Sequence, residues 1–385
     1  MLSNRVYFLL GLFLPLLPLL GVIPFSWDRK KKLISYSKHG RLLTRFNFIL
    51  IFGMFLFPAI QTIRLSLTGG NINDVNTSYV RSIARLISLE IFSLLMFRED
   101  DGFSVINSLL ILLRHINNVY LPNFDPNESK YSYLLEFVFL IIGGGVGLLA
   151  LANLVVIILL PNSSSQLGSV LPSNTPSLIR FIVTYVYPCH CLIIIHVALY
   201  IIACVGFLYG VIVVPFVIFE FHVDRKKYLT LEELRKPYTL MKAFRMMQVM
   251  QDKLMHLVGI FLVPTQSFFG NLIVFCSYMI IKYRHEMNIA TVGMMFVWSF
   301  MGFVSWGWIL LVGGYLHLYR SRVLTSWKYH QWRTPQERRI MSKFRKSCKP
   351  IMIHYGKTYT IRRVSVLKFI RGFTKGILDA LLTLD

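Results

Sequence analysis

Residues Phe46–Leu65 read FNFILIFGMFLFPAIQTIRL, and only Arg64 in this stretch is charged. As an α-helix the stretch would be about 30 Å long, which matches the hydrocarbon core of a bilayer. Eight Lys and Arg residues precede it, and none lies between it and the next apolar stretch. Because short cytoplasmic loops retain basic residues, the sequence predicts a membrane-spanning helix that starts in the cytoplasm.

Six further apolar stretches follow, and the loops between them alternate between basic and nearly neutral. The seven predicted spans are residues 46–65, 80–97, 132–160, 196–221, 255–281, 289–318 and 359–384. Of the 41 Lys and Arg residues, 30 fall on the side of the N-terminus, two fall on the other side and nine lie within or beside spans. This asymmetry predicts an all-α membrane protein with seven transmembrane helices, a cytoplasmic N-terminus and an extracellular C-terminus.

The composition agrees with a single membrane domain. Hydrophobic residues make up 55% of the 385 positions, and the chain has no stretch suited to a separate soluble domain. A net charge of +23 would suit a nucleic-acid binder, but the basic residues are spread over loops between spans, so no nucleic-acid partner is expected. The five cysteines form no pattern typical of an extracellular disulfide framework.

Two apolar stretches have more than one interpretation. Tyr7–Phe25 could be a signal peptide or an eighth span, but three prolines interrupt it, and cleavage would put the following lysines outside. A broken segment that dips into the inner face is therefore favoured. The apolar run 178–221 could form a hairpin of two spans, but this would move the later basic loops outside. We expect one span, with the part around 181–191 extending it outward or resting on the outer interface.

Three glycosylation sequons test this topology. Asn76 and Asn162 fall in predicted external loops, and we expect both to be glycosylated. Asn127 falls in a predicted cytoplasmic loop, where no glycan is expected.

The sequence shows no catalytic or metal-binding constellation. His285-Glu286 lacks the second histidine of a zinc-protease helix, and no nucleophile elbow or phosphate loop occurs. The acidic run Glu99–Asp101 follows Arg98 and is interpreted as a solvated helix start rather than a metal site. The glycines of 143–147 lie within a predicted span and favour close helix packing. We therefore expect neither an enzyme nor a resident cofactor or metal.

The final apolar stretch, from Thr358 to Leu384, has two distinct faces if it is helical. One face carries Lys368, Arg371, Lys375 and Asp379, and the other carries Val366, Phe369, Ile370, Phe373 and Ile377. Charges near the middle of a membrane must face water or partners, and a basic stripe becomes a ring of charge when subunits surround an axis. The alternative is an amphipathic helix that lies flat on the inner surface and binds anionic lipid.

On these features the chain resembles the insect gustatory and odorant receptor superfamily. The resemblance covers nearly the whole length: seven spans, a cytoplasmic N-terminus, very short outer loops and a long basic stretch before a short last helix. The run Pro18–Trp27 is also similar to the start of such chains. The gustatory branch carries Thr-Tyr, about five apolar residues and Gln-Phe. Here Thr358 and Tyr359 match, two arginines interrupt the apolar run, and Lys368-Phe369 replaces the later pair, as in a divergent member.

The resemblance implies a tetrameric ligand-gated ion channel in the plasma membrane, opened by a small tastant or odorant. The last helix of each subunit would line a central pore, with Val366, Ile370 and Phe373 as gate candidates and Lys368, Arg371 and Lys375 as charged positions. The region 320–357 would form the main contact between homo- or hetero-tetramer subunits. The residues expected in the ligand pocket are Arg85, Tyr185, Tyr200, Met294 and Trp298. Membrane lipid is the remaining expected partner.

Two other protein classes share the span count. A G-protein-coupled receptor has an external N-terminus, which the distribution of basic residues disfavours. A small-solute transporter would need intramembrane carboxylates, and only Glu90, Glu136 and Glu220 lie near span ends. The last helix would also repel cations if its basic stripe faced the pore, so the ion preference stays open.

Overall fold

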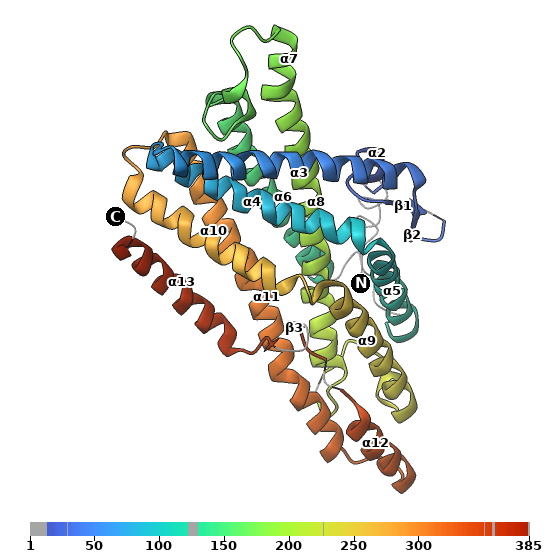
Figure 1. The fold of residues 1–385 in the computed structure, drawn as a ribbon. Helices are drawn as coiled ribbons and strands as arrows, with labels where there is room; N and C mark the ends of the chain where they lie inside the picture. The colour runs from blue at the N-terminus through green and yellow to red at the C-terminus, as the bar shows by residue number, and fades with distance from the viewer. Residues whose placement is uncertain are drawn as a thin grey trace.

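The computed structural model describes residues 14–28, 30–121, 130–225, 227–349, 351–355 and 359–383. These residues form a long helical bundle with two short β-hairpins (Figure 1). Helix α7 projects at one extremity and α12 at the other, while α13 lies along one side of the bundle. The all-helical architecture predicted from hydropathy is confirmed.

Seven helical rods account for the predicted spans. They are α3 (Lys38–Leu67), α4 (Ile72–Phe97), α6 (Lys130–Leu159), the continuous rod of α7 (Ser177–Phe181), η2 (Ile182–Val186) and α8 (Tyr187–Leu208), α10 (Leu262–Tyr283), α11 (Ile289–Tyr329) and α13 (Val364–Thr383). Five of the seven, all except α4 and α13, are long and apolar enough to cross a membrane on length and composition. Both exceptions carry several charged side chains along their length.

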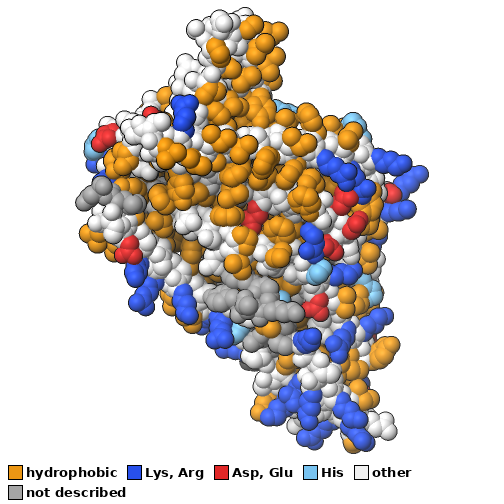
Figure 2. All heavy atoms as spheres, in the orientation of Figure 1, with side chains coloured by type: hydrophobic (Ala, Val, Ile, Leu, Met, Phe, Trp, Pro, Cys, Tyr) orange, Lys and Arg blue, Asp and Glu red, His pale blue; other side chains and the backbone are white. Residues whose placement is uncertain are grey.

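Shorter elements gather mainly at one end, which we call the basic end and which comprises the described residues within the ranges 14–45, 98–121, 221–258 and 320–363. They are α2 (Leu16–Leu19), β1 (Phe25–Asp28), β2 (Leu33–Tyr36), α5 (Glu99–Tyr120), η5 (Glu232–Arg235), α9 (Pro237–Val258), α12 (Pro335–Ser347), β3 (His354–Tyr355) and β4 (Tyr359–Thr360). In Figure 2 most Lys and Arg side chains lie over this end, and hydrophobic side chains cover much of the remaining visible surface. The π-helical turns η3 (Tyr209–Val213) and η4 (Phe216–Glu220) continue α8 toward it.

Hydrogen bonds connect the successive basic segments to one another. Asn107 of α5 pairs with the backbone of Ile34 in β2, with its Oδ1 accepting at 2.9 Å and its Nδ2 donating at 3.1 Å. Lys253 Nζ of α9 donates to Ser104 of α5 at 3.0 Å. Arg245 of α9 donates to Ser347 of α12 at 3.1 Å. The basic segments predicted to share one side of the membrane therefore lie together.

The three loops predicted to lie on the other side also meet. Asn73 Nδ2 at the start of α4 donates to Glu286 Oε2 in the α10–α11 turn at 2.8 Å. Ser164 Oγ in the α6–α7 loop donates to Asp74 Oδ1 at 2.9 Å. The alternation deduced from charge thus agrees with the arrangement of the rods, and we call this second end the loop end.

An aromatic core holds the basic end together. Trp327 of α11 is 2% exposed, and its Nε1 donates to the backbone oxygen of Phe221 at 2.8 Å. Its ring lies 5.0 Å from Phe244 of α9 and 6.0 Å from Phe344 of α12, measured between centroids. Buried Glu220 accepts hydrogen bonds from the backbone of Leu229 and from Thr230, so it closes the loop after η4 and does not act as an intramembrane acid.

Local sequence explains where several rods begin. Ser37 accepts a hydrogen bond from Gly40 N and caps α3, and Asn288 caps α11 in the same way. Thr334 and Glu337 form a reciprocal capping box at the start of α12. Glu99, Asp100 and Asp101 form the first turn of α5, which confirms their interpretation as a helix start.

Several boundaries predicted from hydropathy were wrong. The span predicted at 255–281 is broken at 259–261, so residues 255–258 belong to the amphipathic helix α9 and the rod itself starts at Leu262. The last helix starts at Val364 rather than Tyr359, because Tyr359–Thr360 pair with His354–Tyr355 as a hairpin. The rod that was predicted to start at 196 starts at Ser177, which confirms that the 181–191 stretch extends it as a helix.

Glycines on α11 allow the segment before α13 to dock closely. A Cβ at Gly313 would lie 2.8 Å from the side chain of Ile361, and one at Gly314 would lie 3.1 Å from the Cα of Arg363. Ile361 is fully buried and its N–H donates to the backbone oxygen of Ile353 at 3.1 Å. The start of α13 is therefore held against the middle of α11.

The N-terminal apolar stretch is broken, as its prolines predict. Residues 1–13 of the chain lie outside the described residues, and α2 packs against the start of α3 at the basic end. Gly21 adopts a φ of +66°, and Asn47 Nδ2 of α3 donates to the backbone oxygens of Leu20 and Gly21. This turn returns the chain to α3, which fits a segment confined to one face of the membrane.

Candidate ligand-binding cavity

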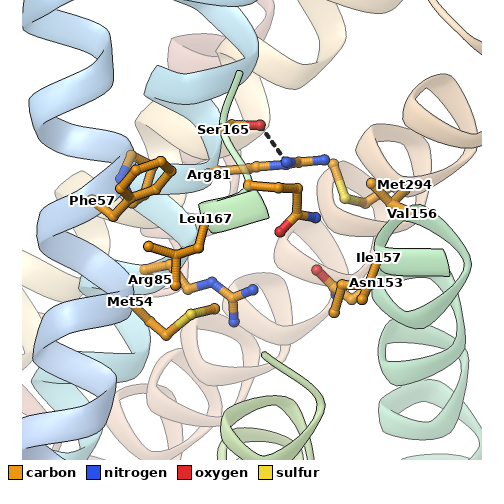
Figure 3. A pocket seen from close by; sticks show the side chains of 12 residues that line it. Met54, Phe57, Arg81, Arg85, Asn153, Val156, Ile157, Ser165, Leu167 and Met294 are labelled. Carbon is orange, nitrogen blue, oxygen red and sulfur yellow. Dashed lines mark hydrogen bonds between the residues drawn. The ribbon is translucent and has the colours of Figure 1, made fainter. Parts of the chain in front are cut away.

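A cavity lies near the loop end between α3, α4, α6, α11 and the loop that joins α6 to α7. Figure 3 shows α3 and α6 on opposite sides of it, with the side chains of α4 pointing into the space between them. The lining residues are Met54, Phe57, Pro58, Arg81, Arg85, Asn153, Val156, Ile157, Ser165, Gln166, Leu167 and Met294. Seven of the twelve lining residues are apolar, and no Asp or Glu is among them.

Arg81 is the most deeply buried charged residue in this lining. Its side chain is 6% exposed and comes from the third turn of α4. Nη1 donates hydrogen bonds to the hydroxyl oxygens of Ser165 and of Ser163, the second at 3.3 Å. Nη2 is buried and has no hydrogen-bond partner within the part of the chain that the structure describes. One side of the guanidinium therefore holds the α6–α7 loop while the other side remains unsatisfied.

Arg85 lies one helical turn further along α4 and extends into the same cavity (Figure 3). Its side chain is only partly buried. Among the described residues it forms no ion pair, and no hydrogen bond of its guanidinium is present. Residues four apart lie on one face of a helix, so the two guanidinium groups face the same space.

The α6–α7 loop covers the cavity. Gln166 and Leu167 line it, and η1 (Leu167–Val170) carries the chain onward toward α7. Gly168 packs tightly in this cover, since a Cβ there would lie 2.7 Å from the backbone oxygen of Pro161 and 3.0 Å from Thr184 Oγ1. The loop is thus held to α4 through Arg81 and Asp74 and to the α7–α8 rod through Gly168.

In this conformation the cavity is narrow, with free space for little more than a water molecule. Its lining includes Met54 and Met294, whose side chains adapt readily to a neighbour because they are unbranched. A larger ligand can enter only if these side chains or the covering loop move. Occupancy of the cavity is therefore coupled to the conformation of its walls.

The sequence placed five residues in the expected pocket, and two of them line this cavity, Arg85 and Met294. Trp298 lies one turn from Met294 and packs in the neighbouring apolar cluster at 6% exposure. Tyr185 contacts Phe181 at 5.7 Å between ring centroids, and Tyr200 lies beside Gly143. Neither tyrosine is among the lining residues.

The sequence reasoning missed Arg81 and the serine loop. Arg81 and Arg85 are four apart within a predicted membrane span, and that spacing was the available signal. Asn153 of α6 was also missed, although a lone amide inside a strongly apolar helix is a similar signal. Its Nδ2 donates to the backbone oxygen of Leu149 at 2.8 Å.

The predicted pore residues occupy two sides of α13. Phe369 and Phe373 pack against Phe303 of α11, with centroid distances of 5.7 and 5.5 Å, and Val366 packs against the core of the basic end. The side that faces away from the chain's own bundle exposes Lys368, Ile370, Arg371 and Lys375.

The structure describes only part of the Thr-Tyr signature at the start of the last segment. Thr358 lies outside the described residues, and Tyr359 belongs to β4 rather than to a helix. Asn127 also lies outside the described residues, while Asn162 is exposed in the α6–α7 loop and Asn76 is half-buried in the second turn of α4. Within the described residues, no three His, Cys, Asp or Glu side chains gather as a metal site requires.

Comparisons with known proteins find no match in sequence but a clear match in fold. No sequence model of a protein family matches the chain, and no curated protein matches it in sequence. The fold, however, matches that of the insect olfactory receptor OR5 from Machilis hrabei in complex with eugenol, with a TM-score of 0.69 at 9% identity. The match covers 98% of this chain and 100% of that one. The chain has the fold of an insect olfactory receptor.

A second structure of the same olfactory receptor gives a TM-score of 0.67 at 11% identity and covers 98% of each chain. Because the olfactory-receptor fold extends over almost the entire chain, it accounts for the seven rods and for the basic end together. It is also not the fold expected for either rival class, the G-protein-coupled receptor or the small-solute transporter.

Proposed function

We propose that this chain is a divergent member of the insect gustatory and odorant receptor superfamily and acts as a chemosensory ligand-gated ion channel. The observation that carries the proposal is the olfactory-receptor fold over 98% of the chain. The covered cavity between α3, α4, α6 and α11 adds to it, because a receptor needs an enclosed site with a few convergent polar groups. The proposed location is the plasma membrane.

The proposed ligand is a small organic molecule that enters the cavity. The matching olfactory receptor was solved with eugenol, a small aromatic compound. A ligand opens a channel only by binding the open state more tightly than the closed state. In the proposed mechanism, the wall movement that admits a ligand into the narrow cavity accompanies channel opening, so that the ligand binds the open state more tightly.

The proposed assembly is a tetramer in which α13 of each subunit lines a central pore. Exposed Lys368, Arg371 and Lys375 support this proposal, because cations on a membrane helix need water or partners rather than lipid. The subunits would contact one another through residues 320–357, at the basic end. Closed rings of identical subunits are the usual symmetry of such assemblies. Related receptor subunits could replace some copies in a hetero-tetramer.

Recording from excised membrane patches tests the proposed function. With the chain expressed alone and a panel of sugars, bitter compounds and volatiles applied to outside-out patches, we expect at least one compound to evoke current without added nucleotides. A channel needs no G protein, so the response should persist with a non-hydrolysable GDP analogue inside the pipette. Surface-labelled chain that gives no current with any compound, alone or with related subunits, would refute the proposal.

The proposed orientation predicts glycosylation at the loop end. Asn162 is exposed, and its loop would face the outside, so the expressed chain should carry a glycan that peptide N-glycosidase removes. Replacing Asn162 by Gln is expected to remove this shift in gel mobility, with Asn76→Gln as a parallel test of the second external sequon. Asn127→Gln is the control and should leave mobility unchanged. Loss of the glycan only in the Asn127→Gln variant would show that the chain has the opposite orientation in the membrane.

A further inference from the structure

The cavity holds two arginine side chains and no acidic one. Arg81 and Arg85 both line it, and the other lining residues are apolar or uncharged. Arginine stays protonated in proteins, so both groups bring positive charge into this site. A buried charge is unfavourable unless it is paired, and two like charges on one helix face repel each other. The residues that line the cavity therefore supply no negative charge to balance the two arginines.

The described hydrogen-bond partners of the two arginines supply no negative charge. Two serine hydroxyls accept hydrogen bonds from Nη1 of Arg81, and they are neutral. Nη2 of Arg81 is buried without a partner among the described residues. The nearest acidic residue on the same helix toward the loop end, Asp74, is engaged by Ser164. Glu90, five residues beyond Arg85, points about 140° away around the helix axis.

We propose that the cavity selects small organic anions, above all carboxylates, which Arg81 and Arg85 bind together. This inference rests on the proposed function, since it names the ligand class of the same site. A carboxylate has two oxygens that accept hydrogen bonds from guanidinium groups in a well-defined geometry. Here Nη2 of Arg81 and the guanidinium of Arg85 supply donors from one side.

The remaining walls define the other half of the ligand. Met54, Phe57, Ile157, Leu167 and Met294 are apolar and lie around the arginine pair (Figure 3). They suit a short aliphatic or aromatic body attached to the acid group. Gln166, on the covering loop, adds one further polar side chain at the cavity. An anion bound here would draw α4 and the covering loop toward a common centre.

Butanoate and butanamide form a matched pair of probes, because they have nearly the same shape and only butanoate is charged at neutral pH. With the purified full-length chain in a carboxylate-free buffer of low ionic strength, we expect butanoate to raise the thermal unfolding midpoint in a saturable manner and butanamide to have no effect. The same shift from both compounds would overturn the inference. A shift given in full by chloride, with none added by butanoate, would identify an adventitious ion only and would also overturn it.

Single substitutions test whether butanoate binds at Arg85 and Arg81. Arg85→Gln is the principal variant, because Arg85 has no hydrogen bond or ion pair with the described residues and its loss should not disturb the fold. We expect it to weaken butanoate binding by at least about tenfold, the loss usual for removing a hydrogen bond to a charged group. Arg85→Lys, which keeps the charge, should restore part of the affinity. Arg81→Gln should also weaken binding, although it releases the serine loop as well.

Arg180→Gln is the matched control. Arg180 lies on α7, where its Nη2 donates to the backbone oxygens of Pro172 and Ser173, and it does not line the cavity. Butanoate affinity should be unchanged in this variant. Equal affinity in the parent chain and in Arg85→Gln would overturn the inference, as would a thermal shift with laurate but none with butanoate, which would indicate a lipid site.

Measurements of butanoate binding and of ligand-evoked current distinguish failure of the anion site from failure of the proposed channel function. Butanoate that binds through Arg85, in a chain that gives no current with butanoate or any other compound in any subunit combination, supports the anion site and counts against the channel. Currents evoked only by neutral compounds, and unchanged by Arg85→Gln, support the channel and overturn the anion site.

Discussion

Replacing Trp327 by Ala is expected to destabilise the chain by about 3–5 kcal/mol, the range found for deleting a large buried aromatic side chain. Trp327 is 2% exposed and its ring packs against Phe244 and Phe344, so three helices lose contacts at once. The backbone oxygen of Phe221 also loses its hydrogen-bond donor, at an additional cost of about 1–3 kcal/mol if water cannot replace it.

The free-energy range given above comes from water-soluble proteins, and it applies to Trp327 because this residue lies beyond the membrane core. Helix α11 has 41 residues and is therefore about 60 Å long, twice the thickness of a bilayer core. Its last turns, including Trp327, must extend beyond the membrane, where exclusion of water drives apolar packing. The expected readout is a lower unfolding midpoint in detergent and loss of the monodisperse peak on size-exclusion chromatography.

The control for this experiment lies two residues further along the same helix. Tyr329 is 69% exposed, and Tyr329→Ala should change the free energy of unfolding by less than about 0.5 kcal/mol. If Trp327→Ala unfolded at the parent temperature, the aromatic core would not be what holds α9, α11 and α12 together.

Neutralising Lys368 and Arg371 together by Gln is expected to move the reversal potential of the ligand-evoked current by tens of millivolts. Both side chains are exposed on the side of α13 that faces away from the chain's own bundle. In a tetramer the double variant removes eight positive charges from the proposed pore. Under a tenfold salt gradient, ideal cation selectivity and ideal anion selectivity lie roughly 59 mV on either side of zero.

The direction of the change follows from electrostatics. Fewer positive charges repel cations less and attract anions less, so the reversal potential should move toward the cation equilibrium potential. Lys30→Gln with Lys31→Gln is the matched control, because it removes equal charge from the exposed turn between β1 and β2, away from α13 and outside the proposed subunit contact. A reversal potential that responds equally to both double variants would assign Lys368 and Arg371 to a general surface effect rather than to the pore.

The apolar stretches predicted the rods, and the alternation of basic and neutral loops predicted which ends of the rods lie together. Charge in a short loop depends on the side of the membrane, so it reports topology without knowledge of packing. The 178–221 stretch illustrates this strength. Hydropathy alone allowed a hairpin there, and only the basic residues after 225 required the single rod that the structure contains.

Helix boundaries were less predictable because docking on another element decides them. Residues 359–363 are compatible with a helix, yet Ile361 is buried against Gly313 and the preceding residues pair as a hairpin. No periodicity within 359–384 reveals this contact, since the glycines that permit it lie on α11. The break at 259–261 has a similar cause, because the Met-rich helix α9 belongs to the core of the basic end.

The cavity was predictable only in part. Arg85 and Met294 were found by position along their spans, whereas Arg81 was overlooked because a single arginine near a span end usually extends toward water. Its burial depends on the α6–α7 loop, which folds over it and supplies two serines. A contact between segments about 80 residues apart leaves no local trace in the sequence.

Helix α11 carries both a wall of the cavity and the support of α13. Met294 lines the cavity, and Phe303, about 14 Å further along the helix, contacts Phe369 and Phe373. In the proposed receptor, ligand recognition and channel gating would therefore be coupled through this one helix, while Arg81, Arg85 and Asn153 lie on α4 and α6. In that receptor, substitutions on α4 and α6 would change which compounds bind without altering the contact between α11 and α13, an arrangement that would suit rapid diversification of ligand preference.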